Sequence, residues 1–548
     1  MNYTELADLL FPGVSGTPED LERRYPPRAL PEGARVTRMA PSPTGFMHLG
    51  NLFGAMVDER LAHQSGGVFF LRIEDTDQKR EVAGGVETIL KVFDDYALPF
   101  DEGATLTGDA GDYGPYRQRQ RAGVYHICAR WLVQQGRAYP CFLTEAELAD
   151  MRETQAEQKL NFGCYGSFAI YRDSTLDEIR RRLADGQPYV IRYRSEGSIL
   201  NRIKVADLVR GTLDLPENNQ DVVLLKADGI PTYHFAHVVD DHFMRTNVVV
   251  RGEEWLPTLP MHVQLFAAMG WKVPKYLHTA HLMKQDGGGK RKLSKRKDPE
   301  LALDFYGEKG YPVAAVKEYL MSLLNSNYED WRAANSTLPL EDFAFSPKKM
   351  SVSGALFDMD KLDDVSRGVI ARLDAAGVQA QLLPWAEKHD ADFAALLKRD
   401  ATFTLGMLAI GRGGKKPRKD ITVWGEAKAY FSFFFDETFA PDYTLPQCVP
   451  ADKAREMLVV FRDLYNPTDD STVWFNKVKE MAKTFGYADD MKAYKQNPEN
   501  WPGSVADVSC VLRLAIAGRL QSPDLYEVMR VMGPEMVRAR LQRMIDSI

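Results

Sequence analysis

A strand-like segment followed by a proline-rich turn and a helix-like segment constrains the fold of this chain most. Residues 36–40 have the apolar character of a short buried strand, which the prolines that follow bring to an end. Apolar residues at helical spacing run through 49–61, and a second buried-type strand covers 68–73 before a helix expected near Arg80. This order of elements predicts a parallel α/β sheet.

Strand-like texture returns later, at residues 221–225, 238–239 and 248–251. The mixed stretch between the two halves, about residues 117–215, reads as an insertion into one sheet. Ligands of such sheets bind outside the carboxyl ends of the strands. Beyond about residue 300 helical periodicities replace strand signals. Helices are expected at residues 313–324, 369–382, 393–397, 454–464 and 525–548. We therefore predict a Rossmann-like parallel-sheet domain, split by an insertion and followed by an all-α region.

Length and composition narrow the class of protein. A chain of 548 residues is too long for one core, and about three to five domains are expected. The first residues lack the pattern of a signal peptide, and no apolar run approaches the roughly 20 residues that cross a bilayer. Five scattered cysteines argue against a disulfide framework and favour a reducing compartment. These features predict a cytoplasmic protein with no membrane contact.

The net charge of −7 does not indicate nucleic-acid binding, so local basic patches matter more than the total charge. The densest basic stretches are residues 290–297 and 412–419. Taken alone, each is more often a solvated loop than a binding site.

The block at residues 38–51 (RMAPSPTGFMHLGN) is the first candidate for chemistry. It places His48 and Gly50 near the start of the expected helix, where exposed N–H groups and the helix dipole favour a phosphate. Histidine donates to phosphoryl oxygens, and glycine allows a nucleotide close to the backbone. The simpler alternative is a capped helix with a chance histidine, which the length of the block disfavours.

The second candidate is residues 292–296 (KLSKR), preceded by three glycines at 287–289. Lysines on a flexible glycine-hinged loop close over a triphosphate and neutralise the charge that develops as pyrophosphate leaves. A Walker A loop is excluded because Lys290 is followed by Arg291 instead of Ser or Thr, and because no strand is expected before it. A solvated basic loop remains the alternative for this stretch alone.

Together these blocks resemble a known family. The first is similar to the HIGH signature region of the glutamyl-tRNA synthetases, and the second to their KMSKS loop. Further strings in the family's order are 71–77 (LRIEDTD), 224–235 (LLKADGIPTYHF), 238–242 (VVDDH) and 250–255 (VRGEEW). Near the C-terminus, 512–518 (LRLAIAG) and 522–526 (SPDLY) are similar to the family's anticodon-binding end.

The resemblance implies a class I aminoacyl-tRNA ligase that uses ATP with Mg²⁺, L-glutamate and tRNA(Glu). Glutamyl-adenylate forms first, and the terminal ribose of the tRNA, at its 2′-hydroxyl, then takes the glutamyl group. His48 and Lys295 would stabilise transition-state charge, Lys292 would bind the phosphates, and Gly50 would allow close approach of the nucleotide. His48, Lys292 and Lys295 are thus the catalytic candidates. The implied ATP-binding residues are Pro41, His48, Gly50, Asn51, Lys292, Leu293, Ser294, Lys295 and Arg296.

The resemblance also implies a glutamate site. Arg38 and Arg251 would meet the side-chain carboxylate, which suits the permanently charged, bidentate guanidinium. Tyr233 would add a hydroxyl donor, and Glu74 would accept from the α-ammonium group. The implied glutamate-binding residues are Arg38, Ala40, Ser42, Glu74, Tyr233 and Arg251.

The resemblance implies a monomeric chain with six parts. These are an extension at 1–34, catalytic halves at 35–116 and 216–275 around an insertion for the tRNA acceptor end at 117–215, a KMSKS-loop and stem-contact region at 276–360, and a helical anticodon-binding region at 361–548.

Some features depart from the family pattern. Cys141 and Cys164 retain one cysteine from each half of a zinc site found in some members, and two thiols cannot complete a tetrahedral site, so no zinc is predicted. His237 stands where the family often has a small polar residue, and the extension at 1–34 has no counterpart at the typical family start.

Several rival functions stay open at this stage. A glutaminyl-tRNA synthetase, or an enzyme that also charges tRNA(Gln), is the nearest, although residues 40–45 (APSPTG) have the bacterial glutamyl form. A tRNA-modifying paralogue, a non-catalytic homologue and a small-molecule nucleotidyltransferase are disfavoured by the long helical tail or by the intact motifs.

Overall fold

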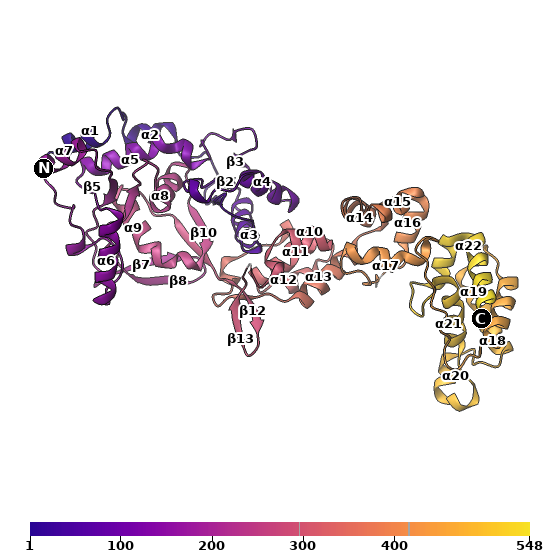
Figure 1. The fold of residues 1–548 in the computed structure, drawn as a ribbon. Coiled ribbons are helices and arrows are strands. Elements are labelled where there is room, and N and C mark those ends of the chain that lie inside the picture. Colours follow the sequence, from indigo (N-terminus) through magenta and orange to yellow (C-terminus); the bar gives the residue numbers. More distant parts are fainter. Residues whose placement is uncertain (295, 415–416) are drawn as a thin grey trace. The chain divides into compact units, whose positions relative to one another are not determined.

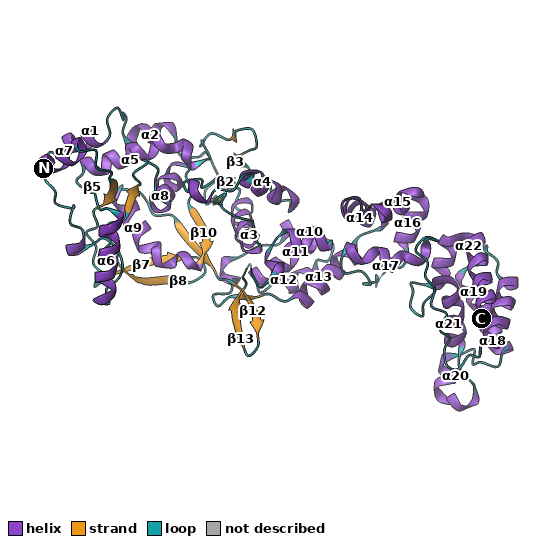
Figure 2. Ribbon diagram, in the orientation of Figure 1, coloured by secondary structure: helices purple, strands orange, loops and turns teal. Residues whose placement is uncertain are grey.

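The structure is a computed structural model that describes residues 1–294, 296–414 and 417–548. It divides into two compact units (Figure 1). The first comprises Met1–Phe305 and Lys317–Asp358, and the second Tyr306–Val316 and Met359–Ile548. Within the described residues every strand belongs to the first unit, as the orange arrows of Figure 2 show. The predicted fold class, a parallel-sheet α/β domain followed by helices, is confirmed.

Two short sheets with parallel strands form the centre of the first unit. Asn247 joins them, because its N–H donates to the carbonyl of Val36 at 3.1 Å and its Oδ1 accepts from the N–H of Val36 at 2.9 Å. The first sheet has the order β1 (Val36–Met39), β2 (Val68–Leu71), β3 (Glu102–Ala104) and β4 (Asp109–Ala110), of which the first three are parallel. The second has the order β10 (Val248–Gly252), β11 (Lys275–Thr279), β7 (Arg202–Asp207) and β8 (Gly211–Pro216), again with three parallel strands.

Helices α3 (Leu49–His63) and α8 (Tyr233–Phe243) carry much of the site. The strand texture expected at residues 238–239 was wrong, because both valines lie inside α8. Most residues of α8 from Phe235 onward are buried, so the helix lacks the polar face that marks an amphipathic helix in sequence. The helix expected near Arg80 is a single 3-10 turn there, and α4 begins at Gly85 and ends at Asp95.

Two adjacent aspartates on α8 hold three buried arginines. Asp241 accepts from Nε of Arg38 at 3.1 Å and from Nη1 of Arg72 at 2.6 Å. Asp240 accepts from Nε of Arg121 at 2.6 Å. All five side chains are at most 4% exposed, so each charge depends on its partners for stabilisation. These pairs tie α8 to the first strands of the sheet.

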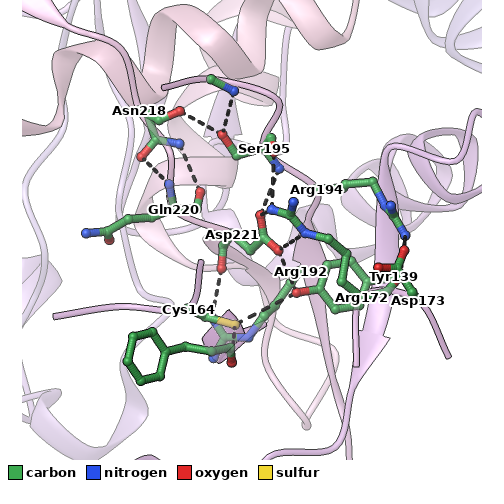
Figure 3. Close-up of polar contacts among 12 residues, drawn as sticks. Tyr139, Cys164, Arg172, Asp173, Arg192, Arg194, Ser195, Asn218, Gln220 and Asp221 are labelled. Atoms are coloured by element: carbon green, nitrogen blue, oxygen red, sulfur yellow. Dashed lines mark hydrogen bonds and ion pairs between the residues drawn. The ribbon is translucent and has the colours of Figure 1, made fainter. Parts of the chain in front are cut away.

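An antiparallel sheet lies around another buried carboxylate, Asp221 (Figure 3), and takes two of its three strands from the range expected for the insertion. Asp221 accepts from the hydroxyl of Tyr139 at 2.7 Å, from Nε of Arg172 at 2.8 Å and from the N–H of Ser195 at 2.8 Å. The strands of this sheet are β5 (Ala138–Cys141), β6 (Val190–Tyr193) and β9 (Val223–Leu225). Strand β9 lies after residue 215 but pairs with β6, which lies before it, and β7 lies before residue 215 but pairs with β11, which lies after it. The expected boundary at residue 215 therefore does not separate the two sheets.

Replacing Asp221 with Ala should lower the free energy of unfolding by about 2 kcal/mol, because a partly buried Arg172 then loses its counter-charge. Urea denaturation followed by circular dichroism measures this. Asp173→Ala is the matched control, since Asp173 meets Arg194 but is 83% exposed, and should change stability by less than about 0.5 kcal/mol. Equal effects of the two substitutions would contradict the role given to Asp221.

The first 34 residues form two helices, α1 (Tyr3–Leu10) and α2 (Pro18–Arg24). Both pack on α5 (Ala122–Gln134), within the range expected for the insertion. Arg28 then donates to both oxygens of Glu102 at 2.7 and 2.9 Å and to the carbonyl of Met244 at 3.2 Å. The remaining helices of this unit are α6 (Glu145–Glu157), α7 (Leu176–Ala184), α9 (Leu259–Ala268) and α12 (Tyr328–Ala334).

Gly287 and Gly288 form the turn of a hairpin and Gly289 begins its second strand, which corrects two expectations. Strand β12 (Leu282–Asp286) precedes them, although no strand was expected there, and β13 (Gly289–Lys292) follows in antiparallel pairing. Lys292 therefore lies on a strand and not on a flexible loop. A third strand, β14 (Ala355–Leu356), pairs with β12.

The second unit is helical and has one large apolar core. The helix expected at 369–382 is two helices, because Asp374 caps a new start by accepting from the N–H of Gly377 at 2.7 Å. The last helix is broken at Gly533, whose φ of 77° suits glycine. The bounds are α13 (Met359–Arg372), α14 (Ala375–His389), α15 (Ala391–Arg399), α16 (Ala401–Ala409), α17 (Ala427–Phe431), α18 (Ala451–Leu464), α19 (Ser471–Thr484), α20 (Met491–Gln496), α21 (Val505–Ala517) and α22 (Leu525–Ser547). Helices α10 (Asp304–Lys309) and α11 (Val313–Leu324) include residues of both units.

Candidate active site

A cavity of about 380 Å³ lies at the carboxyl ends of β1 and β10. This is the edge at which parallel α/β sheets bind ligands. Twelve residues singled out from the sequence line it, and they come from segments more than 200 positions apart. They are Arg38, Ala40, Pro41, Ser42, His48, Gly50, Asn51, Glu74, Tyr233, Arg251, Lys292 and Leu293.

The start of α3 forms part of the cavity wall. His48 is the N-cap residue, and its N–H donates to Oδ1 of Asn51 at 3.0 Å. A Cβ on Gly50 would lie 3.0 Å from Cε1 of His48, so a side chain there would press on the imidazole. The helix start thus presents an exposed histidine beside bare backbone, which suits a phosphate-bearing ligand.

The hairpin of β12 and β13 brings Lys292 to the same cavity. Asp298, which sequence reasoning missed, anchors the residues that follow: it accepts from Nη1 and Nη2 of Arg291 at 2.6 and 2.7 Å and from the N–H of Ser294 at 2.8 Å. Hydrogen bonds from Arg291 hold the pKa of Asp298 well below its usual range. Leu293 is buried against this hairpin, whereas Arg296 is exposed. Ser294 and Arg296 do not line the cavity, and Lys295 lies outside the described residues.

Two arginines from β1 and β10 also line the cavity. Arg38, on β1, donates through Nε to Asp241 and through Nη1 to the carbonyl of Val250 at 3.3 Å. Arg251, on β10, is 8% exposed, and its Nη2 donates to no residue that the structure describes. A buried guanidinium with an unused donor is a strong site for a carboxylate.

Glu74 and Tyr233 line the same cavity. Glu74 accepts from Nη2 of Arg72 at 3.1 Å, and burial raises the pKa of its carboxyl group. The ring centre of Tyr233 lies 4.3 Å from that of Trp255. The Tyr233 ring is also stacked parallel to the His237 ring, with the centres 5.8 Å apart. Burial raises the pKa of the Tyr233 hydroxyl. Trp255 also lines the cavity but had no predicted role.

Asp58 is a second lining residue that sequence reasoning missed. It lies on α3, is 2% exposed, and its Oδ1 accepts no hydrogen bond from the described part of the chain. Burial raises the pKa of Asp58 well above its usual value. Its position gives no distinctive sequence signal, because Asp58 begins an ordinary charged run with Glu59 and Arg60.

Comparison with known proteins decides the family. The family described as "tRNA synthetases class I (E and Q), catalytic domain" matches residues 35–364, and that described as "Anticodon binding domain" matches residues 504–545. The glutamate–tRNA ligase of Acetivibrio thermocellus is 51% identical over 546 residues, covering 100% of both chains. That of Clostridium perfringens strain SM101 is 46% identical over 550 residues, again with full coverage of both.

The chain belongs to the glutamate–tRNA ligase family. A crystal structure of a glutamate tRNA ligase from Elizabethkingia meningosepticum in complex with its amino acid superposes with a TM-score of 0.75, at 26% identity, over 94% of this chain and 99% of that one. As a glutamate–tRNA ligase of class I the chain is an ATP-using enzyme. Among its described residues no helix has the length and apolar character needed to cross a membrane.

Proposed function

We propose that this ligase activates L-glutamate with ATP and transfers the glutamyl group to the 3′-terminal ribose of tRNA(Glu). The observation that carries the proposal is one cavity that Arg38 and Arg251 line together with His48, Gly50 and Lys292. Such a cavity fits an amino acid with a second carboxylate beside a nucleotide, because each anionic group meets fixed positive charge or N–H donors.

In the first step an α-carboxylate oxygen of glutamate attacks the α-phosphorus of ATP, and pyrophosphate leaves with the electrons of the broken P–O bond. His48 and Lys295 stabilise the negative charge that grows on the phosphoryl oxygens, and Lys292 holds the phosphates. In the second step the 2′-hydroxyl of the terminal ribose attacks the glutamyl carbonyl carbon, loses its proton, and AMP leaves. Positioning and electrostatics therefore supply most of the catalysis.

For the amino acid we propose that Arg38 and Arg251 pair with the side-chain carboxylate and that Tyr233 donates to it. Glu74 accepts from the α-ammonium group, whose positive charge offsets the burial that raises the pKa of Glu74. Ser42 supplies a small polar contact and Ala40 lines the wall beside it. Pro41, Asn51, Leu293, Ser294 and Arg296 are proposed to contribute to the nucleotide site.

Mg²⁺ is proposed to arrive bound to the phosphates of ATP. Among the described residues no group of three or more His, Cys, Asp or Glu side chains is placed to hold a metal ion. The absence of a bound zinc ion stays a prediction. Cys141 and Cys164 are buried free thiols.

We further propose that residues 117–215 bind the acceptor end of the tRNA, that 276–360 contact its stem, and that 361–548 read the anticodon. The match of residues 504–545 to an anticodon-binding domain supports the last assignment. A monomer working in the cytoplasm is proposed, in keeping with cysteines that form no disulfide within the described chain.

Charging of purified tRNA(Glu) and tRNA(Gln) with labelled glutamate and glutamine tests the function. We expect glutamate on tRNA(Glu) and no glutamine on either tRNA. Transfer of glutamine would contradict the assignment of two arginines to the amino-acid side chain, because an amide leaves a buried guanidinium unpaired.

Arg251→Gln should raise the KM for glutamate about ten- to a hundredfold, the usual effect of losing a charge-assisted hydrogen bond, with the KM for ATP little changed. Steady-state charging of tRNA(Glu) with each substrate varied measures both constants. Arg202→Gln is a matched control, because Arg202 pairs with Asp214 on the exposed surface. An unchanged KM for glutamate in Arg251→Gln would remove Arg251 from the glutamate site.

A further inference from the structure

Arg251 is held by two histidines, and with the described residues it forms no ion pair. Its Nε donates to Nε2 of His278 on β11 at 2.9 Å, and its Nη1 lies 3.0 Å from Nδ1 of His262 on α9. Both imidazoles are fully buried. Arg38, by contrast, is paired with the carboxylate of Asp241. The positive charge of Arg251 is therefore positioned but not neutralised by its protein neighbours.

The contacts of His278 define which nitrogen carries its proton. Oδ2 of Asp207 lies 2.7 Å from Nδ1 of His278 and also accepts the backbone N–H of His278 at 3.0 Å. A carboxylate only accepts, so Nδ1 carries the hydrogen and Nε2 keeps a lone pair for Arg251. Burial opposes ionisation of Asp207, but the hydrogen bond from His278 and those from nearby backbone N–H groups hold its pKa below the usual value. Asp207 thus orients His278 in the way that a carboxylate orients a metal-binding histidine.

His262 is oriented by the same logic. Guanidinium nitrogens only donate, so Nδ1 of His262 accepts from Arg251 and its Nε2 carries the hydrogen. That Nε2 lies 3.0 Å from Nδ1 of His234, which accepts in turn. Donation therefore runs outward from Arg251 in two directions, through His278 to Asp207 and through His262 to His234.

We propose that His278 and His262 are positioning residues for the amino-acid substrate, which hold two nitrogens of Arg251 so that its third, Nη2, is presented to the side-chain carboxylate of glutamate. Two observations carry this. Nη2 is buried and donates to no described residue, and Arg251 lines the cavity. The inference rests on the proposed role of Arg251 in glutamate binding and adds the residues that set its orientation and charge.

Neutral histidines serve this purpose better than carboxylates would. A carboxylate paired with Arg251 would cancel the charge that attracts the substrate, whereas a neutral imidazole fixes the guanidinium and leaves its charge in place. An uncharged glutamine side chain would then leave that charge buried and unsatisfied, which is costly. The two histidines are thereby linked to the selection of acid over amide.

The surroundings keep both imidazoles neutral. His278 faces Asp207, Arg210, Arg251 and Tyr276. Burial, together with the charges of Arg251 and Arg210, lowers the pKa of His278 although Asp207 opposes this. The groups that face His262 are His234, His237, Tyr233, Asp241 and Arg251. Burial lowers the pKa of His262 well below its usual value, and burial lowers that of His234 to about 4. Neither imidazole therefore gains a proton, and with it a charge beside Arg251, near neutral pH.

The test compares two substitutions of His278. His278→Phe keeps a ring but removes the acceptor, and should raise the KM for glutamate about tenfold, with kcat and the KM for ATP within about twofold of the parent. His278→Gln places a carbonyl oxygen near the position of Nε2 and should restore the KM for glutamate to within about threefold of the parent. Charging of tRNA(Glu) under saturating tRNA gives all three constants, and thermal unfolding checks that each variant folds.

His63→Phe is the matched control, because His63 also meets carboxylates, Glu59 and Asp101, but lies outside the cavity. A KM for glutamate unchanged in His278→Phe, or no rescue by His278→Gln, would overturn the inference. So would an equal rise in the KM for ATP. Arg251→Gln distinguishes failure of the glutamate site from failure of the histidine role. If Arg251→Gln leaves the KM for glutamate unchanged, the proposed glutamate site is wrong. If Arg251→Gln raises that KM and His278→Phe does not, only the role of the histidine is wrong. The double variant Arg251→Gln/His278→Phe gives a further check. A KM for glutamate no higher than that of Arg251→Gln alone supports the inference, whereas a KM raised by the product of the two single effects contradicts it.

Discussion

His48→Ala should reduce the rate of glutamyl-adenylate formation about 10²–10³-fold, the usual effect of removing one donor from a developing oxyanion. His48 lies at the N-cap of α3 and lines the cavity beside Gly50 and Lys292. Because its contact is strongest when charge grows on the phosphoryl oxygens, kcat should fall while the KM for glutamate stays nearly constant. ATP–pyrophosphate exchange in the presence of tRNA(Glu) measures the step directly.

Two further variants separate chemistry from helix capping in this experiment. His48→Asn keeps a good N-cap residue and a side-chain donor, and should recover part of the rate. His63→Ala, at the other end of the same helix, should leave exchange nearly unchanged. If His48→Ala exchanges pyrophosphate as fast as the parent, His48 has no part in transition-state stabilisation.

Asp241→Ala should lower the free energy of unfolding by about 3–5 kcal/mol, the second large effect. The substitution leaves Arg38 and Arg72 as two buried guanidiniums without the carboxylate that they share. It should also abolish ordinary glutamate affinity, because Arg38 loses the contact that fixes its Nε. Chemical denaturation of the purified enzyme measures the first effect, and charging kinetics the second.

A surface aspartate provides the comparison. Asp214→Ala removes an ion pair with Arg202 in which both side chains are about half exposed, and should change stability by less than about 1 kcal/mol. Similar losses in the two variants would show that Asp241 is no more than an ordinary ion-pair partner.

The same carboxylate gives a pH dependence with a defined sign. Burial would raise the pKa of Asp241, but Arg38, Arg72 and His237 hold it well below the usual value. A group whose pKa is depressed by folding stabilises the folded state above its unfolded pKa, near 4, and loses that contribution as pH falls through the folded value. The stability contributed by Asp241 is therefore complete at neutral pH and is lost only in strong acid.

Much of the site could be predicted from sequence because its chemistry is carried by short, ordered strings. Arg38, His48 and Gly50 stand in one block, and Arg251 and Lys292 in two others, and the structure brings all five to one cavity. Strand and helix periodicity located β1, β2 and β10, and helices α15, α18 and α22 of the second unit, for the same reason, since each has a strong local pattern.

The residues that were missed act through partners distant in sequence. Asp241 was quoted only as part of a string, and nothing local shows that it meets Arg38 and Arg72, 203 and 169 positions away. His278 lies in a short, mostly buried strand of mixed sequence, where one histidine looks like any buried polar residue. Helix α8 was misread at residues 238–239 because it is buried almost all round, and burial erases the periodicity on which helix prediction depends.

The long-range contacts of Arg28 and Arg38 affect the order in which the chain folds during its synthesis. Arg28 emerges from the ribosome 216 residues before Met244, whose carbonyl it binds, and Arg38 emerges 203 residues before Asp241. At typical elongation rates of about 5–20 residues per second, this delay is roughly 10–40 s. During that interval Arg38 lacks the counter-charge of Asp241, so we expect this part of the core to close only when α8 has been made.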